Sequence, residues 1–250
     1  MYKLKIFIIT LPFILASSYA YGSTWQQDKA TQIYNNYGVR VHFEYERNKF
    51  FDYYERTVDE GRCAGSASKK EISVFLNQLA TFLKKYPKRL IRKTLKNIYF
   101  CRGLSFYGIE RFAGAYYGNK IWGEQRARGS SREFYEKMLH HEYSSVLLKK
   151  HKYKFPKKRW LRISGSGYYG GDFTCPLGGA WHHTRTMRQD GFLYCYSKTN
   201  FENDFNVLAE SYLRDGGERM MHNATRNYPK LRAKLEIVKD YYRWLFARYE

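Results

Sequence analysis

The segment from Ser131 to Lys150, SREFYEKMLHHEYSSVLLKK, predicts the helix around which the rest of the fold is built. Ser131 is a typical N-cap residue, because its hydroxyl can accept a hydrogen bond from a backbone amide of the first turn. The residues that then follow along one face at helical spacing are Phe134, Met138, His141, Ser145 and Leu148. Since titratable and polar side chains occupy the centre of this face, we expect the helix to carry chemistry as well as packing.

The segments before this helix predict a small sheet and one more long helix. The alternation from Val39 to Tyr45, VRVHFEY, is typical of a strand. Apolar residues recur at helical spacing from Lys69 to Lys85, with Ser68 as the candidate N-cap. We expect residues 89–107 to form a short helix that leads into a strand, and residues 112–123 to form two strands around a Gly-Asn turn.

The segments after the central helix are a long loop and two further helices. Residues 160–191 form a glycine-rich, aromatic segment whose length is typical of a functional or disulfide-linked loop. Helices are predicted for Asn203 to Arg214 and for Pro229 to Tyr249. No repeat or linker divides the sequence, so we expect one α+β domain over residues 21–250: a small mixed sheet packed on the central helix, with a helical C-terminal part.

Residues 1–20 have the features of a secretory signal peptide. Lys3 and Lys5 precede an apolar run from Ile6 to Leu15, and Ser18-Tyr19-Ala20 offers small residues at the two cleavage positions. No later stretch approaches 18 uncharged apolar residues, so no transmembrane segment is expected after cleavage. The mature protein is therefore predicted to be soluble and either periplasmic or secreted.

The cysteines are even in number, in a chain bound for an oxidising compartment, and predict two disulfides. They are Cys63, Cys101, Cys175 and Cys195. Three connectivities are possible, of which Cys63 with Cys101 and Cys175 with Cys195 would link each half of the chain locally. No C-x-x-C spacing occurs, so a zinc site built from cysteines is not indicated.

The chain is strongly basic, with 44 Lys and Arg residues against 23 Asp and Glu and a net charge of +21. Removal of the signal peptide, which holds two lysines and no acid, lowers this to +19. Such a charge attracts polyanions, and anionic envelope polymers are a natural partner for an exported protein. Basic residues gather within residues 84–96 and 149–159. Because charge runs are usually solvated surfaces, nucleic acid is not the expected partner.

The sharpest chemical signal in the predicted central helix is His141-Glu142. In the helical motif H-E-x-x-H, two histidines one turn apart bind zinc and the glutamate activates a water molecule. His141 and Glu142 match the first half of the motif. Ser145 stands at the position of the second histidine, and a hydroxyl is a poor zinc ligand beside imidazole or carboxylate.

Other histidines are alternative donors for such a site. His140 cannot replace the second histidine, because neighbouring helix residues diverge by about 100°. His151 lies ten residues after His141, the separation of the third histidine in the extended motif, but the glycine that this motif needs for its turn is absent. His182 and His183, in the glycine-rich loop, could supply a ligand from outside the helix.

Downstream of this helix, residues 191–200 (GFLYCYSKTN) lead into residues 202–210 (ENDFNVLAE). Together with His141-Glu142, this pattern resembles the secreted zincin-type metallopeptidases, specifically the subgroup of anthrax lethal factor and the Mlc titration factor peptidases. In that subgroup a tyrosine follows the H-E-x-x-H helix, and an acidic ligand then opens a second helix beside a phenylalanine. The resemblance covers about residues 69–242.

The resemblance implies a zincin-like fold, zinc as the cofactor and a peptide or protein as the substrate. His141 matches the first zinc ligand, Glu142 the general base, and Tyr196 the tyrosine that can hydrogen-bond the oxyanion of a tetrahedral intermediate. For the third ligand, spacing from Tyr196 favours Asp204, and Glu210 ranks nearly equal. The two acids lie six residues apart and point to different faces of a helix, so they are not expected to bind one ion together.

The expected function is therefore zinc-dependent hydrolysis of peptide bonds in the periplasm or outside the cell. The alternative is a non-catalytic pseudoenzyme on the same fold, whose basic surface binds the cell envelope. A secreted nuclease is the rival enzyme class, but no local nuclease motif surrounds the histidines.

Overall fold

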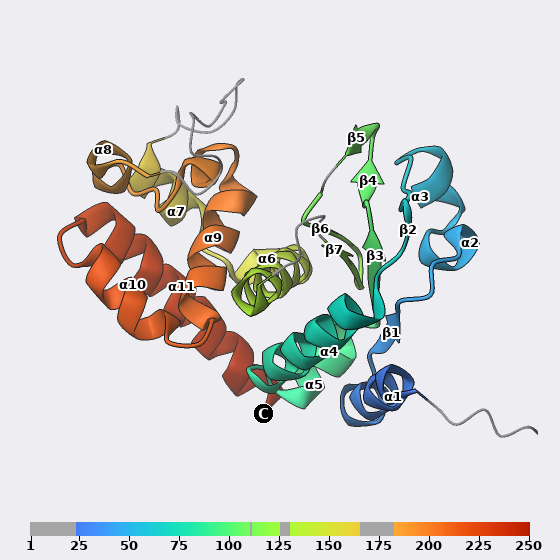
Figure 1. The fold of residues 1–250 in the computed structure, drawn as a ribbon. Coiled ribbons are helices and arrows are strands. Elements are labelled where there is room, and N and C mark those ends of the chain that lie inside the picture. The colour runs from blue at the N-terminus through green and yellow to red at the C-terminus, as the bar shows by residue number, and fades with distance from the viewer. Residues whose placement is uncertain (1–23, 111, 126–130, 166–182) are drawn as a thin grey trace, which may run out of the picture.

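The computed structural model describes residues 24–110, 112–125, 131–165 and 183–250 of the 250-residue chain. These residues form the expected α+β fold, with a small sheet followed by a mostly helical C-terminal half (Figure 1). The elements of the first half are α1 (Trp25–Tyr37), β1 (Arg40–His42), α2 (Arg47–Phe50), α3 (Tyr53–Thr57), β2 (Gly65–Ser66), α4 (Lys69–Lys84), α5 (Lys88–Thr94), β3 (Asn97–Arg102), β4 (Ser105–Phe106), β5 (Ile109–Glu110), β6 (Gly114–Tyr117) and β7 (Lys120–Gln125). Those of the second half are α6 (Arg132–Lys150), η1 (Lys152–Lys154), α7 (Lys157–Ser164), α8 (Arg185–Gln189), η2 (Cys195–Lys198), α9 (Phe201–Leu213), α10 (Gly217–Thr225) and α11 (Pro229–Tyr249).

The main sheet is mixed and has the strand order β1-β3-β7-β6. Strand β3 pairs in parallel with both β1 and β7, whereas β6 pairs antiparallel with β7 and β2 pairs antiparallel with β3. The predicted hairpin of residues 112–123 is confirmed as β6 and β7, and Gly118 supplies the positive φ of +59° that its tight turn needs. The strand predicted for residues 39–45 is shorter than expected, because only Arg40–His42 pairs with β3.

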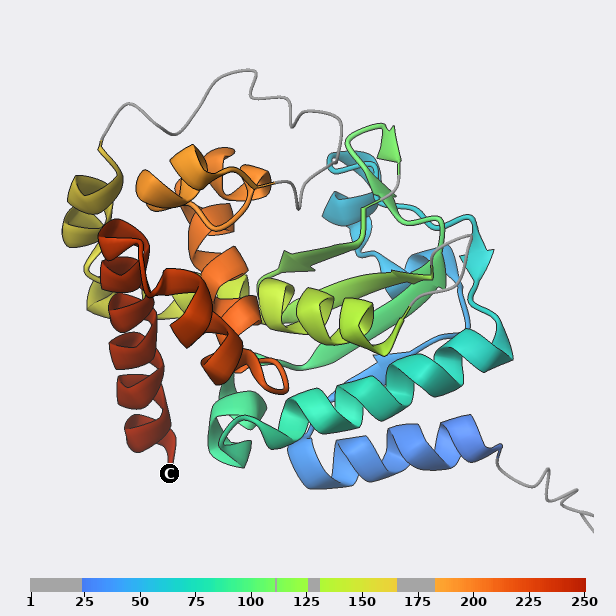
Figure 2. The same ribbon diagram turned by 60° about the vertical axis from the view of Figure 1, so that its left-hand side comes forward.

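Alternation along the strands divides the apolar residues between the two faces of this sheet. Ile98 and Phe100 of β3 join the larger apolar cluster, which includes residues of α4, α6, α9 and α11. Their neighbours Tyr99 and Cys101 join a second cluster with Trp122, under α2 and the β4–β5 pair. The sheet is therefore covered on both faces, and Figure 2 shows α1 alongside α4 on the side of the larger cluster.

Helix α4 confirms the prediction for residues 69–85. Ser68 caps it by accepting a hydrogen bond from the backbone N–H of Glu71, and the apolar residues form one buried stripe. The predicted short helix and strand within residues 89–107 are confirmed as α5 and β3.

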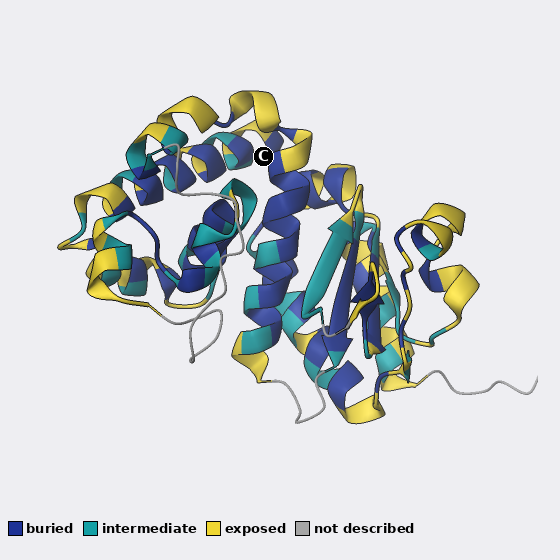
Figure 3. Cartoon of the chain, turned by 90° about the horizontal axis from the view of Figure 1, so that it is seen from above, coloured by how far each residue is buried: buried dark blue, intermediate teal, exposed yellow. Residues whose placement is uncertain are grey.

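Helix α6 is the predicted central helix, and Ser131 caps it through a hydrogen bond from the backbone N–H of Phe134. It is buried around most of its circumference rather than along one stripe, because α4 and the β6–β7 hairpin pack on one flank and α9 on another. Figure 3 shows it in dark blue between the strands and the C-terminal helices.

The C-terminal half confirms two predicted helices and differs in the segment before them. Helices α9 and α11 correspond to the helices predicted for residues 203–214 and 229–249. Residues 160–191 are not one loop: their two ends belong to α7 and α8, and residues 166–182 lie outside the described part of the chain. Helices α1 and α10 were not predicted.

Among the connectivities that the sequence leaves open, the structure pairs Cys63 with Cys101, and this disulfide closes a loop of 38 residues. Cys195 is also disulfide-bonded, whereas Cys175 and the signal peptide of residues 1–20 lie outside the described residues. The signal peptide therefore stays a prediction. Across the part of the chain that the structure describes, no helix is long and apolar enough to cross a membrane.

Candidate active site

A pocket of about 250 Å³ lies where β6, α6 and the start of α9 meet. Three of the five residues assigned to the site from the sequence lie at this pocket. His141, Glu142 and Tyr196 line it, together with Ser145 and Glu202. The pocket is therefore the candidate active site.

Helix α6 presents the two motif residues because of the close approach of strand β6. Gly114 of β6 packs directly against the helix, where a Cβ atom would stand 2.9 Å from Cγ of Glu142 and 2.8 Å from Cγ of Met138. Such distances leave no room for a side chain on β6 at this point. The glycine thus lets the strand lie against the helix face that carries Glu142.

His141 is held by an acidic residue of α9. Its Nδ1 donates a hydrogen bond to Oε2 of Glu210 over 2.7 Å, and Glu210 is 1% exposed. Burial alone lowers the pKa of His141, but the hydrogen bond and the negative charge of Glu210 outweigh it and raise that pKa above its ordinary value. The imidazole ring is therefore fixed in orientation by a partner 69 residues away in the chain.

Glu142 presents a buried carboxyl group to the pocket. It is 8% exposed, and no described residue donates a hydrogen bond to it. Burial raises its pKa to about 7, with smaller effects from His141, which lowers it, and from Glu202 and Glu210, which raise it. A carboxyl group with this pKa can exchange a proton at neutral pH.

Two tyrosines face the same pocket from opposite sides. Tyr196, in η2, has its ring centroid 5.8 Å from that of His141, and burial raises the pKa of its phenol to about 12. Tyr116, in β6, also lines the pocket, and burial, with a smaller effect of Glu202, raises the pKa of its phenol. Both phenols therefore keep their protons at neutral pH and can donate hydrogen bonds.

Ser145, at the position of the second histidine of the motif, has a hydrogen-bond partner of its own. Nδ2 of Asn206 donates to Oγ of Ser145 over 2.6 Å, and both side chains are buried. Helices α6 and α9 are thus joined by two polar pairs, Ser145 with Asn206 and His141 with Glu210. His141 and Ser145 lie one turn apart on α6, and their partners lie one turn apart on α9.

The structure does not bring Asp204 to this pocket. Oδ2 of Asp204 accepts hydrogen bonds from Nζ of Lys234 over 2.6 Å and from Nε1 of Trp160 over 2.9 Å, on the other face of α9. Lys234 and Asp204 are both fully buried. Asp204 and Glu210 point to different faces of α9, and of the two only Glu210 is hydrogen-bonded to His141.

The alternative histidines lie elsewhere. His140 is buried on the far face of α6, where Nδ1 is hydrogen-bonded to the phenol of Tyr86 over 2.7 Å. His151 is buried at the end of α6 beside Tyr249. His183 is exposed, and His182 lies outside the described residues.

The donor atoms at His141 and Glu210 fit zinc in part. An imidazole nitrogen and a carboxylate oxygen are ordinary zinc ligands. Oε1 of Glu210 is buried and has no hydrogen-bond partner, so that oxygen has a free lone pair for a cation. Within the described residues, however, no three His, Cys, Asp or Glu side chains converge as a ready metal-binding group. The described residues thus offer two such ligands at the site.

Sequence reasoning missed a polar stripe on α9 that completes the pocket. Asn203, Asn206 and Glu210 follow one another at helical spacing on the face toward α6. Asn203 lines the pocket, and the other two contact α6. This spacing is visible in the sequence and would have separated Glu210 from Asp204, which lies off the stripe.

His141, which is paired with the buried Glu210, and Glu142 thus lie at one pocket of an α+β fold. The sequence matches, over residues 84–247, the model of the family described as "putative zinc-binding metallo-peptidase", and the chain belongs to this family. Membership supports zinc as the cofactor, as expected from the sequence.

A solved structure has a similar fold. It is a crystal structure titled as a putative zinc-binding metallo-peptidase from Bacteroides caccae ATCC 43185, with a TM-score of 0.50 and 17% sequence identity over 91% of this chain and 93% of that one. At this identity the likeness concerns the fold alone. No curated protein matches the chain.

Proposed function

We propose that the chain is an exported, zincin-like zinc peptidase that hydrolyses peptide bonds in the pocket between β6, α6 and α9. The observation that carries the proposal is the single pocket in which Glu142 lies beside the His141–Glu210 pair. Family membership supports a peptidase, and the predicted signal peptide supports export to the periplasm or the medium.

His141 and Glu210 are the residues that would hold the zinc ion. When bound, zinc supplies Lewis-acid chemistry, because it polarises a carbonyl group and lowers the pKa of water. Glu142 is placed to take a proton from the attacking water and to pass it to the leaving amine, since its carboxyl group faces the pocket without a hydrogen-bond donor. Tyr196 donates a hydrogen bond to the developing oxyanion.

Strand β6 supports a peptide as the substrate. It is an edge strand of the main sheet among the described residues, and all four of its residues, Gly114–Tyr117, line the pocket. An edge strand offers unpaired backbone N–H and C=O groups to which an extended peptide can pair. A peptide bound in this way would pass over Glu142.

One observation favours a second candidate, a cleft that binds peptides without cutting them. At the position of the second ligand, Ser145 accepts a hydrogen bond from Asn206, so the described residues of the site offer fewer zinc ligands than a complete motif. The basic surface would then recruit the protein to anionic envelope polymers.

Zinc content of the mature chain, purified without a histidine tag, separates the two candidates. The peptidase requires about one zinc per chain, which is lost in His141→Ala and kept in the control His222→Ala, an exposed histidine away from the pocket. Hydrolysis of peptides should disappear in Glu142→Gln while the zinc remains. A wild-type chain without zinc that gains the metal in Ser145→His would favour the binding cleft.

A further inference from the structure

The candidate active-site pocket has the opposite charge from the rest of the protein. Its described lining includes no Lys or Arg, although the chain has 44 of these residues against 23 Asp and Glu. The lining does include four carboxyl groups, which belong to Glu55, Asp59, Glu142 and Glu202. In so basic a chain, a pocket lined by acidic residues is expected to bind a positively charged partner.

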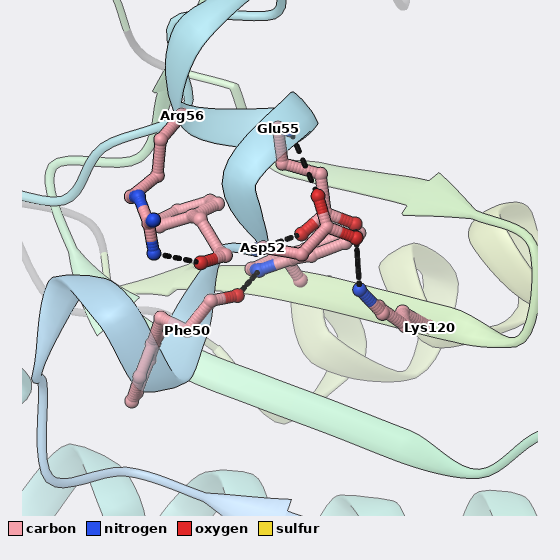
Figure 4. Close-up of polar contacts among 7 residues, drawn as sticks. Phe50, Asp52, Glu55, Arg56 and Lys120 are labelled. Atoms are coloured by element: carbon pink, nitrogen blue, oxygen red, sulfur yellow. Dashed lines mark hydrogen bonds and ion pairs between the residues drawn. The ribbon is translucent and has the colours of Figure 1, made fainter.

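One of these four carboxyl groups is already neutralised. Glu55, which is 1% exposed, accepts a hydrogen bond from Nζ of Lys120 over 2.8 Å, and Lys120 also contacts Asp52 over 3.0 Å (Figure 4). The side chain of Glu55 also caps α3 through the backbone N–H of Asp52. This cluster fixes α3 to β7 as one wall of the pocket, and it leaves Glu55 without charge to offer a ligand.

The other three carboxyl groups form no ion pair with Lys or Arg among the described residues, although the imidazole of His141 lies near Glu142. Asp59, which is 6% exposed, lines the pocket near Tyr107, and Glu202 lines it near Tyr116. Glu142 is 8% exposed, faces the pocket and receives no hydrogen bond from a described residue. Buried carboxylates without a counter-charge are costly, so a positively charged ligand would relieve Asp59 and Glu142 and would also pair with the partly exposed Glu202.

The remaining walls are aromatic. Phe106 contacts Trp122 and Phe112 edge-on, with ring centroids 5.7 Å and 5.9 Å apart, and Tyr107 lies beside them. Aromatic faces attract cations and also accept the methylene stem of a long basic side chain. The volume of about 250 Å³ lies below the roughly 300–1,000 Å³ typical of small-molecule pockets, which suits one side chain.

We propose that this pocket binds the lysine or arginine side chain of a peptide, with Asp59 and Glu202 as the carboxyl groups that select its positive charge. The inference rests on the proposed function only in taking a peptide as the ligand. Asp59 and Glu202 come from separate elements, the segment after α3 and helix α9, so they can face the charge from two sides.

The test is calorimetric binding of blocked pentapeptides to the full mature chain. The peptides carry lysine, arginine, norleucine or glutamate at one position between alanines, and blocked termini remove every other charge. We expect lysine and arginine peptides to bind about 10-fold to 100-fold more tightly than the norleucine peptide, as is typical of hydrogen bonds to charged groups. The preference should fall to about 3-fold or less in Asp59→Asn/Glu202→Gln.

The matched control is Glu60→Gln, which removes the same charge from an exposed neighbour of Asp59 and should keep the preference. Thermal melting checks that each variant folds. If a variant with the buried Asp59→Asn change does not fold, Glu202→Gln alone still tests the selectivity. Equal binding of lysine and norleucine peptides overturns the inference, as does a preference that survives loss of both carboxyl groups. Because zinc is assayed separately, a chain without zinc that still prefers lysine would refute the peptidase and not this selectivity.

Discussion

The buried pair of Asp204 and Lys234 yields the sharpest quantitative prediction. Asp204→Asn keeps the shape of the side chain and the acceptor for Trp160, but it removes the only negative charge that the structure places within hydrogen-bond distance of Nζ of Lys234 in the described residues. The lysine is fully buried and donates a second hydrogen bond to the backbone oxygen of Gly191. Burial already lowers the pKa of Lys234 in the wild-type protein, and Asp204 opposes that shift.

The magnitude follows from the proton that Lys234 would have to release. A lysine with a usual pKa near 10.4 becomes neutral at pH 7 at a cost of about 4.6 kcal/mol, at about 1.36 kcal/mol for each pH unit. This sets an upper limit, and removing one partner of a buried pair costs about 3–5 kcal/mol. For a chain of this size, we expect the melting temperature to fall by roughly 6–20 °C.

Denaturant unfolding from pH 7 to pH 9 checks the mechanism. The folded variant holds a neutral Lys234, whereas the unfolded chain still binds its proton, so the stability of the variant should rise with pH by up to about 1.4 kcal/mol per unit relative to wild type. Asp204→Leu/Lys234→Met, which removes both charges, should recover most of the loss. A destabilisation of Asp204→Asn below about 1 kcal/mol would refute the reasoning, and loss of zinc without loss of stability would restore Asp204 as a ligand.

Three further changes test other parts of the fold. Burial, with smaller effects of neighbouring cations, lowers the pKa of His151. The stability that the neutral His151 provides is therefore lost as pH falls below about 6.5. In urea titrations, the free energy of unfolding of His151→Gln should fall less steeply at acid pH than that of the wild-type protein. Gly114→Ala, whose Cβ would press on α6, should cost about 1–3 kcal/mol and abolish peptide hydrolysis, whereas Gly123→Ala, which meets only the flexible end of a methionine, should cost less in the same melts. Replacing Cys63 and Cys101 by serine opens a 38-residue loop. Denaturant titration should show a loss of about 4 kcal/mol in the free energy of unfolding, and an unchanged free energy would contradict a stabilising role of the disulfide.

The helices that could be predicted from the sequence are those whose apolar residues lie along one face of the helix. Helix α4 has such a stripe and a clear N-cap, and its bounds were predicted to within a residue. Helix α1 buries only Ile33 and Tyr37, so periodicity gave little sign of it. Its capping box, Thr24 with Gln27, was nevertheless present in the sequence and would have marked its start.

The candidate site was predicted in part for a similar reason. The motif identified His141 and Glu142, because their spacing on one helix is local information. The stripe of Asn203, Asn206 and Glu210 could have favoured Glu210 over Asp204, but the partner of Asp204 is Lys234, which lies 30 residues beyond it. Such a long-range partner leaves no mark in the spacing of the motif itself.

The position of α6 has a consequence for how the molecule unfolds. Its buried surface is shared between the sheet and α4 on one side and α9 on the other, and a single apolar cluster runs through all of them. Neither half would retain a closed interior if the other melted, because each uses α6 as a wall. The two halves should therefore lose structure in one cooperative transition, and the helix that carries His141 and Glu142 should be among the last segments to exchange its amide hydrogens with solvent.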